Sequence, residues 1–307
     1  MRLLFSQIFS AAFAGSILRV TTPILFATLG AVVADLSGVT NIALEGMMLV
    51  SAFTGVAVSA FTRSAWIGLL AGVAAASLMG LVLGYFHLKL GTNVILAGIA
   101  LNLFASGGTV FLLYVVAHDK GVSSSLASKV LPEIQLPVVS SIPVIGALLG
   151  KQNVLTYLSL LAVAGVYYLL YRTTFGLRLR AVGENPDAAD SVGISVHRVQ
   201  FLALALSGAL AGMGGAHLSM GYVSWFSRDM TSGRGFIALA AEALGRRHPV
   251  GAFLASLFFG LADALSNYMQ SLRVPGEFVS MMPHALTLIA LAVYAGRQDK
   301  SRRRTVS

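Results

Sequence analysis

Long apolar segments separated by short polar stretches dominate the chain. A helix that crosses a bilayer needs about 20 apolar residues, and the segments that reach or approach this length are predicted spans. They lie at 41–61, 65–86, 92–117, 153–171, 199–217, 249–269 and 281–296. Two shorter stretches, 20–34 and 235–245, predict short or re-entrant helices. We therefore expect an all-α polytopic membrane protein with about eight to ten membrane helices.

The N-terminus and the middle of the chain depart from this pattern. Residues 3–18 imitate a secretory signal, but polar residues dilute the apolar run and further spans follow at once. We expect a retained first helix there. Residues 118–152 are polar and broken by prolines, so they predict a loop.

Two short motifs recur in the two halves of the chain. Ser37-Gly38 and Ser232-Gly233 are each followed, after three intervening residues, by Ile-Ala-Leu. Arg63 and Arg246 each precede a further apolar segment. Glycine-interrupted segments at matching positions of two halves are typical of transporters built from repeats; chance matching of small residues is the alternative.

The predicted organisation is one transmembrane domain, 1–307, with repeat one at about 20–117, a loop at 118–152, a helix at 153–171, a second loop at 172–198, repeat two at about 199–296 and a tail at 297–307.

Composition supports the membrane assignment and charge orients it. Hydrophobic residues make up 56% of the chain and charged residues only 11%, against about 25% charged in soluble domains. The net charge of +9 comes largely from basic residues at helix ends and in the tail, which favours an orienting role over nucleic-acid binding. The basic tail predicts a cytoplasmic C-terminus, which places 172–198 inside, 118–152 outside, and the two repeats in inverted orientation.

Several kinds of chemistry find no support in the sequence. There is no cysteine, and the six histidines show no metal-ligand spacing. The sequence lacks the Gly-x-Ser-x-Gly motif that would predict a hydrolase. It also lacks a phosphate-binding Gly-x-x-x-x-Gly-Lys-Ser/Thr loop. We expect neither an enzyme nor a metal or cofactor site, so energy for transport would come from a partner or from an ion gradient.

Polar side chains follow one face of several predicted spans. Asn41, Glu45 and Met48 share a face, as do Asn102 and Ser106. Ionisable groups in a membrane normally face a protein interior or a wet cavity. The candidates for a translocation pathway are Asn41, Glu45, Met48, Asn102, Ser106, Glu242, Asp263 and Asn267. Two alternatives remain open: hydrogen bonds between helices, and ion pairs of Glu45 and Asp263 with Arg234 or Arg246.

The loop 172–198 has an internal design. Asn185 before Pro186 predicts a helix start, Asp187 suits the positive end of a helix dipole, and Gly193 predicts its end after about two turns. A short capped helix on a cytoplasmic loop is suited to docking against another protein. An ordinary basic loop that only fixes topology is the alternative.

Three ordered motifs extend this interpretation. Phe175–Ile194 resembles the coupling loop of binding-protein-dependent ABC importer permeases of the ribose, branched-chain amino acid and nucleoside class. Asn41–Met48 resembles the nucleoside and simple-sugar branch more narrowly, and Gly233–Arg246 is a third match. The resemblance covers about residues 20–296. Ala43 stands where glycine is expected, and Glu242 and Arg247 stand where apolar or aromatic residues are more usual.

The resemblance implies a permease subunit in the bacterial cytoplasmic membrane that imports a small polar solute, either a nucleoside or a simple sugar. It implies three kinds of partner besides membrane lipid: a second permease, ATPase subunits that use ATP and Mg²⁺, and an extracytoplasmic solute-binding protein. The residues expected to contact the ATPase are Arg178, Arg180, Gly183, Glu184, Asn185, Pro186, Asp187, Ala188, Ala189 and Gly193. The rival class is an ion-coupled secondary transporter, which would also show inverted repeats but would need no docking helix.

The predicted topology can be tested by chemical labelling. Single cysteines at Ser124 and Ser191, on this cysteine-free background, should react with an impermeant maleimide from opposite sides of the membrane. Labelling of both positions from one side would contradict the inverted arrangement.

Overall fold

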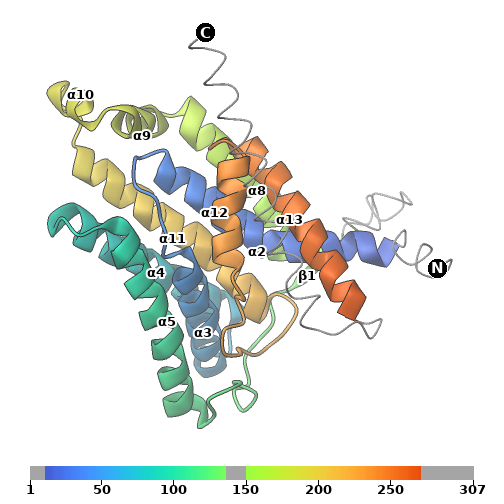
Figure 1. Cartoon of the computed structure of the whole chain (residues 1–307). Helices are drawn as coiled ribbons and strands as arrows, with labels where there is room; N and C mark the ends of the chain where they lie inside the picture. Colours follow the sequence, from blue (N-terminus) through green and yellow to red (C-terminus); the bar gives the residue numbers. More distant parts are fainter. Residues whose placement is uncertain (1–10, 136–149, 271–307) are drawn as a thin grey trace.

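The computed structural model describes residues 11–135 and 150–270. Within these residues, seven helices are long and apolar enough to cross a membrane, so the expected all-α polytopic fold is confirmed (Figure 1). The predicted span 281–296 and the basic tail lie outside the described residues. The long helices are α2 (Ala11–Asp35), α3 (Leu44–Thr62), α4 (Ala65–Gly84, continued by the π-helix η1, Tyr85–Lys89), α5 (Val94–Ala117), α8 (Val154–Arg172), α11 (Val196–Met220) and α13 (Pro249–Gln270).

Helix α2 is continuous through Pro23, so the predicted short helix at 20–34 is wrong. A proline inside a helix leaves the carbonyl four residues earlier without its N–H partner, and here that carbonyl belongs to Arg19. The Nε2 atom of His217 lies 3.3 Å from the Arg19 carbonyl oxygen and can donate to it. A side chain of α11 thus replaces the missing backbone bond, and α2 extends far enough to span.

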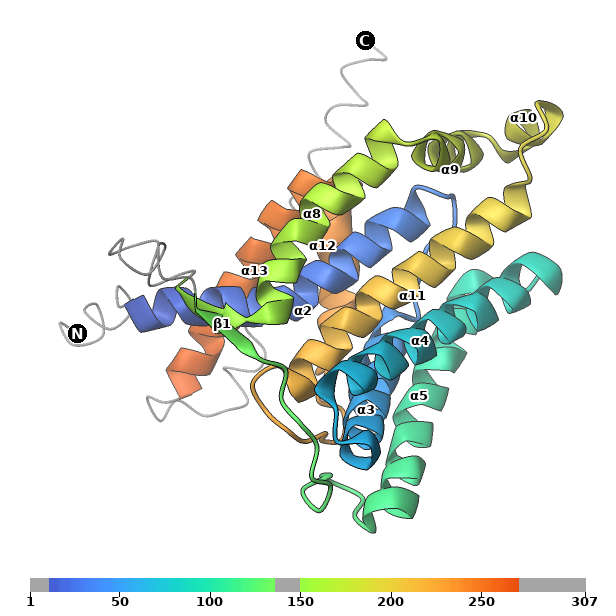
Figure 2. The same ribbon diagram turned by 180° about the vertical axis from the view of Figure 1, so that it is seen from behind.

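Helix α11 lies at the centre of the bundle and packs against α2, α3 and α4. Small residues allow membrane helices to approach closely. A Cβ atom at Gly215 would lie 2.0 Å from the Met48 carbonyl oxygen of α3, and one at Gly80 would lie 2.3 Å from the Leu204 carbonyl oxygen of α11. By contrast, α5 stands at the edge of the bundle in both views (Figure 2).

The described part of the 118–152 loop contains no helix, in agreement with its proline content. It forms a small antiparallel sheet of β1 (Glu133–Gln135) and β2 (Lys151–Asn153), in which Ile134 pairs with Gln152. The loop packs onto the ends of α3 and α11: the Lys129 N–H donates to Ser59 Oγ at 3.0 Å, and the Leu131 N–H donates to the Met220 carbonyl at 2.8 Å. We call this the sheet end of the molecule.

The opposite end carries the segment between α8 and α11. The predicted short helix is present as α10 (Pro186–Ser191). It is preceded by α9 (Thr174–Glu184), a helix that the sequence pattern did not predict. Thr173 Oγ1 accepts from the Gly176 N–H at 3.1 Å and caps α9, and Leu179 and Val182 are buried against the bundle. We call this the α9–α10 end.

The predicted short segment at 235–245 is helix α12 (Arg234–Leu244). Its 11 residues span only about 16 Å, roughly half the hydrocarbon thickness. Helix α3 ends at the sheet end, whereas α12 ends at the α9–α10 end, where Arg247 pairs with Asp35 of α2. The two helices therefore run in opposite directions from N-termini that lie close together (Figure 1).

The recurring motifs show matching backbone conformations. Gly38 and Gly233 both have positive φ, at 85° and 79°, and so do Arg63 and Arg246, at 56° and 55°. Each arginine lies between two helices, α3 and α4 in one half and α12 and α13 in the other. The extents of the two repeats, and their inversion as whole units, stay predictions.

The close crossing of α4 and α11 can be tested by adding single methyl groups. Gly80→Ala should lower the free energy of unfolding by about 1–3 kcal/mol, because the new Cβ meets backbone that cannot move aside. Gly108→Ala in α5 is the matched control, because its Cβ would have no neighbour within 4 Å. Thermal unfolding of the purified protein in detergent measures both, and equal melting temperatures would contradict the packing described.

Candidate functional site

The carboxylate of Glu45 binds the N-terminus of α12. The Gly233 N–H donates to Oε1 at 2.7 Å, and the Gly235 N–H donates to Oε2 at 2.6 Å. The first N–H groups of a helix have no partner within it and carry partial positive charge. Gly233 is the N-cap of α12 and has no side chain to offer, so an acid from another helix supplies both acceptors.

The same carboxylate belongs to the first turn of α3. One negative charge therefore lies beside the positive ends of two helices, an arrangement that stabilises both. The approach is close, because a Cβ at Gly235 would lie 2.4 Å from the backbone nitrogen of Glu45. Only glycine leaves room for this contact.

Two further candidates contact the same stretch of chain, which we call the α12 lead-in (residues 229–235). Asp263 of α13 forms an ion pair with Arg234 at 2.9 Å, and both side chains are largely buried. Ser106 of α5 donates to Asp229 Oδ1 at 2.9 Å. Glu45, Ser106 and Asp263, from three different helices, thus converge on seven consecutive residues.

The α12 lead-in has an unusual backbone. Asp229 and Ser232 have positive φ, at 50° and 47°, and Gly233 follows at 79°. A left-handed conformation costs a non-glycine residue about 1–2 kcal/mol. The side-chain contacts from α3, α5 and α13 hold the lead-in in this conformation, so it is a strained segment held by polar bonds.

Three other candidates fix the start of α3 instead. The Asn102 amide accepts from the Gly46 N–H at 2.8 Å and donates to the Ile42 carbonyl at 2.9 Å. Asn41 Nδ2 donates to Ser207 Oγ of α11 at 2.8 Å. Met48 is fully buried in the core. These side chains join α3 to its neighbours and so fix the position of Glu45 in the first turn of α3.

The last two candidates lie apart from the lead-in. Glu242 is buried at the other end of α12, beside the Asp35–Arg247 ion pair. Asn267 is exposed near the end of α13. The predicted set therefore divides into a cluster at the lead-in, a support for α3, and these two separate positions.

The predicted coupling residues occupy the α9–α10 end. Asn185 Oδ1 accepts from the Ala188 N–H at 3.0 Å and caps α10, as its sequence indicated. Gly193 has φ of 83° just after that helix. Ala189 is buried and anchors α10. The exposed members are Arg178, Glu184, Asn185, Pro186, Asp187, Ala188 and Gly193.

The remaining coupling residues face inward. Arg180 of α9 lies over the ring of Tyr171, with its guanidinium carbon 4.8 Å from the ring centroid. Gly183 packs against the turn that joins α2 and α3, where a Cβ would lie 2.1 Å from the Leu36 carbonyl oxygen. The loop thus presents one face to solvent and the other to the bundle.

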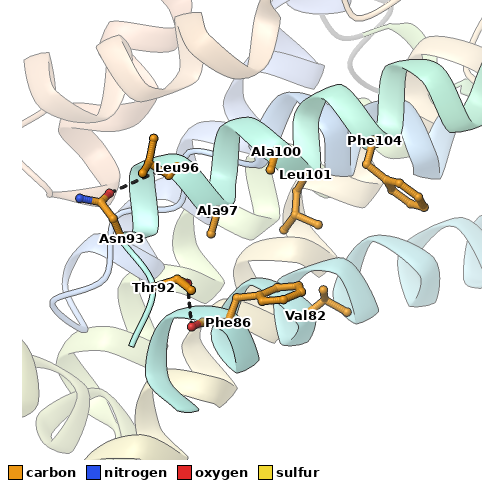
Figure 3. Close-up of a pocket in the computed structure, with 9 residues that line it drawn as sticks. All are labelled: Val82, Phe86, Thr92, Asn93, Leu96, Ala97, Ala100, Leu101 and Phe104. Atoms are coloured by element: carbon orange, nitrogen blue, oxygen red, sulfur yellow. Dashed lines mark hydrogen bonds between the residues drawn. The ribbon is translucent and has the colours of Figure 1, made fainter. Parts of the chain in front are cut away.

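An apolar groove of about 700 Å³ separates α4 and η1 from the first half of α5 (Figure 3). Its few polar groups bond within the chain: Thr92 Oγ1 donates to the Phe86 carbonyl, and Asn93 Oδ1 accepts from the Ile95 N–H. The surface that remains suits an acyl chain or another helix rather than a polar solute. Among the described residues, no group of three or more acidic or histidine side chains could hold a metal ion.

Comparison with known proteins places the chain among transport proteins. Residues 13–291 match the family described as branched-chain amino acid transport system / permease component. The guanosine ABC transporter permease protein NupQ of Bacillus subtilis is 34% identical over 290 residues, which cover 90% of each chain. The putative glucose ABC transporter permease protein TsgC13 of Haloferax volcanii is 34% identical over 270 residues, 87% of this chain and 80% of that protein.

A solved structure, PsaBC from Streptococcus pneumoniae in complex with Fab, shares the fold. Its TM-score is 0.54 at 14% sequence identity, and the match covers 94% of this chain and 95% of that one. At this identity the likeness concerns the arrangement of helices alone.

The bond between Glu45 and α12 can be tested by removing its charge. Glu45→Gln keeps the shape but loses a charged acceptor, and hydrogen bonds to charged groups contribute about 1.5–3 kcal/mol. We expect a lower melting temperature in detergent and faster hydrogen exchange at Gly233 and Gly235. Asn267→Ala is the control, because Asn267 is exposed and lies outside this cluster. Unchanged exchange in the Glu45 variant would contradict the capping role.

Proposed function

Because the chain belongs to the branched-chain amino acid transport permease family, we propose that it is the permease subunit of an ATP-driven importer whose solute is a nucleoside. The guanosine permease matches it over 90% of both chains, and Asn41–Met48 resembles the nucleoside and simple-sugar branch. A simple sugar is the second candidate, favoured by the similarity to a glucose permease.

The observation that carries this proposal is the exposed, capped helix α10 at the α9–α10 end. Leu177 of α9 and Val192 after α10 are 62% and 75% exposed, although both are apolar. They flank the exposed polar residues Glu184 and Asp187. Exposed apolar side chains on either side of a charged, capped helix suit binding of a protein partner, and an ion-driven carrier has no need of such a partner.

The proposed partner at this surface is an ATPase subunit, which would hold the ATP and Mg²⁺. The sequence contains no phosphate-binding loop of its own. A second permease would complete the pathway, and a solute-binding protein would deliver solute at the sheet end. Under this arrangement the C-terminal tail and the α9–α10 end lie on the cytoplasmic side.

We infer that α12 acts as a gate that opens and closes the translocation pathway, because the polar cluster at the α12 lead-in holds this helix in place. Helix α12 does not span, and its N-terminus depends on bonds from three other helices. Displacing α12 along its axis would break the bonds to Glu45 and Asp263 together. We therefore propose that Glu45 and Asp263 hold the gate helix α12 in position and do not bind the solute directly.

Reversing two charges beside α10 tests the proposal. In the variant Glu184→Arg with Asp187→Arg, the change at 187 places positive charge in the first turn of α10, which opposes the dipole of that helix by about 0.3–1 kcal/mol. It also reverses the charge offered to the partner. Both residues are exposed, so the bundle should fold normally. Uptake of radiolabelled guanosine into proteoliposomes containing ATP should collapse, and ATP hydrolysis should no longer respond to loaded binding protein.

The control keeps both charges at the same exposed positions, Glu184→Asp with Asp187→Glu. This variant should keep ATP-dependent uptake. An ionophore separates the two mechanisms, because ATP-driven uptake survives it and gradient-driven uptake does not. Uptake that persists in the Glu184 and Asp187 variant but stops with the ionophore would favour the secondary-transporter alternative.

A further inference from the structure

Helix α9 contacts the turn before α3 directly, and it reaches the turn after α12 through aromatic side chains of α8. On one side, Gly183 packs against the turn between α2 and α3, with a Cβ position 2.1 Å from the Leu36 carbonyl oxygen and 3.1 Å from the Gly38 nitrogen. Gln200 secures the same turn, because its Nε2 donates to the Ser37 carbonyl at 3.2 Å. A movement of α9 therefore pushes directly on the backbone before α3.

On the other side, a stack of rings leads from α9 to α12. The Arg180 guanidinium lies over the Tyr171 ring of α8 at 4.8 Å, and its buried Nε atom has no hydrogen-bond partner among the residues that the structure describes. The Tyr171 ring lies 5.4 Å from the His248 ring, and Tyr167 lies 5.1 Å from Tyr171 and 5.8 Å from His248. Aromatic rings at 4.5–7 Å attract one another, and a cation over a ring adds to this.

His248 occupies the turn between α12 and α13. Its Nδ1 atom accepts from the Val250 N–H at 3.3 Å, and its carbonyl accepts from the Ala252 N–H at 2.8 Å. The turn is tightly packed, because a Cβ at Gly245 would lie 2.5 Å from the Ala252 nitrogen. Displacement of His248 therefore moves the C-terminus of α12 with it.

The other end of α12 is the lead-in, held by Glu45 and Asp263. A rigid helix of 11 residues transmits an axial movement from one end to the other. The contacts thus run from Arg180 of α9 through Tyr171 and His248 to α12, and from the N-terminus of α12 to Glu45. Every step is a contact described above.

We propose that Tyr171 and His248 are positioning residues that pass the displacement of α9 to α12, and so couple ATP hydrolysis to opening of the gate. This role rests on the proposed function. It differs from partner docking, because neither residue lies on the exposed face of α10. Loss of the stack should leave the ATPase bound and active but disconnect it from α12.

The test compares two variants that remove a ring with one that keeps it. Tyr171→Leu deletes the aromatic face, whereas Tyr171→Phe preserves it. His248→Asn deletes the ring but keeps an acceptor for the start of α13, since asparagine is a favoured cap. Each variant is assembled with the ATPase, second permease and binding protein of its own system. Radiolabelled guanosine uptake and ATP hydrolysis are measured per assembled complex.

We expect Tyr171→Leu and His248→Asn each to lower the maximal uptake rate by about tenfold, a typical coupling effect. The concentration of loaded binding protein that gives half-maximal uptake should not change, and hydrolysis should still be stimulated. The number of ATP molecules used per guanosine therefore rises. The double variant should have the same maximal uptake rate as the slower of the two single variants, because both changes interrupt one path. Tyr171→Phe should transport at the unmodified rate.

Equal losses of uptake and of hydrolysis would overturn the proposal, because they indicate impaired docking or assembly. Unchanged uptake in Tyr171→Leu, or additive losses in the double variant, would also overturn it. The proposed function is checked separately with the unmodified complex. Guanosine uptake that does not require internal ATP would refute that function before any variant is compared.

Discussion

Helix α12 begins among polar side chains of α3, α5 and α13, and the first N–H groups of any helix have no partner within that helix. The Glu45 carboxylate accepts from the Gly233 and Gly235 N–H groups and supplies the opposing charge. The support behind Glu45 is equally specific, because Asn102 and Asn41 hold the start of α3 through hydrogen bonds to α5 and α11. The position of the short helix therefore depends on one acid and on the polar contacts that place it.

The sequence predicted the spans and the capped helix α10 because both depend on local patterns. Apolar length identifies a membrane helix, and Asn185-Pro186 identifies a helix start. Helix α2 was divided wrongly because its continuation depends on His217, nearly two hundred residues away in the chain. Helix α9 was missed because its apolar positions are few and its basic residues resemble a topology signal.

The candidate site was predictable only in part, for a physical reason. Ionisable residues within spans were recognised because burying them is costly, and ion pairs with Arg234 or Arg246 were one of the two compensations that the sequence left open. Glu45 binds backbone N–H groups, whereas Asp263 pairs with Arg234. The convergence of three helices on residues 229–235, and the positive φ of Asp229 and Ser232, arise from tertiary packing and leave no local signature.

The His217 bond to the Arg19 carbonyl has a mechanical consequence. A helix bends more readily at a proline, because one of its backbone hydrogen bonds is missing there. Here the neighbouring helix α11 occupies that gap with a buried donor. Bending α2 at Pro23 would deprive both groups of their hydrogen-bond partner in a buried site, so this bond opposes bending of α2 away from α11.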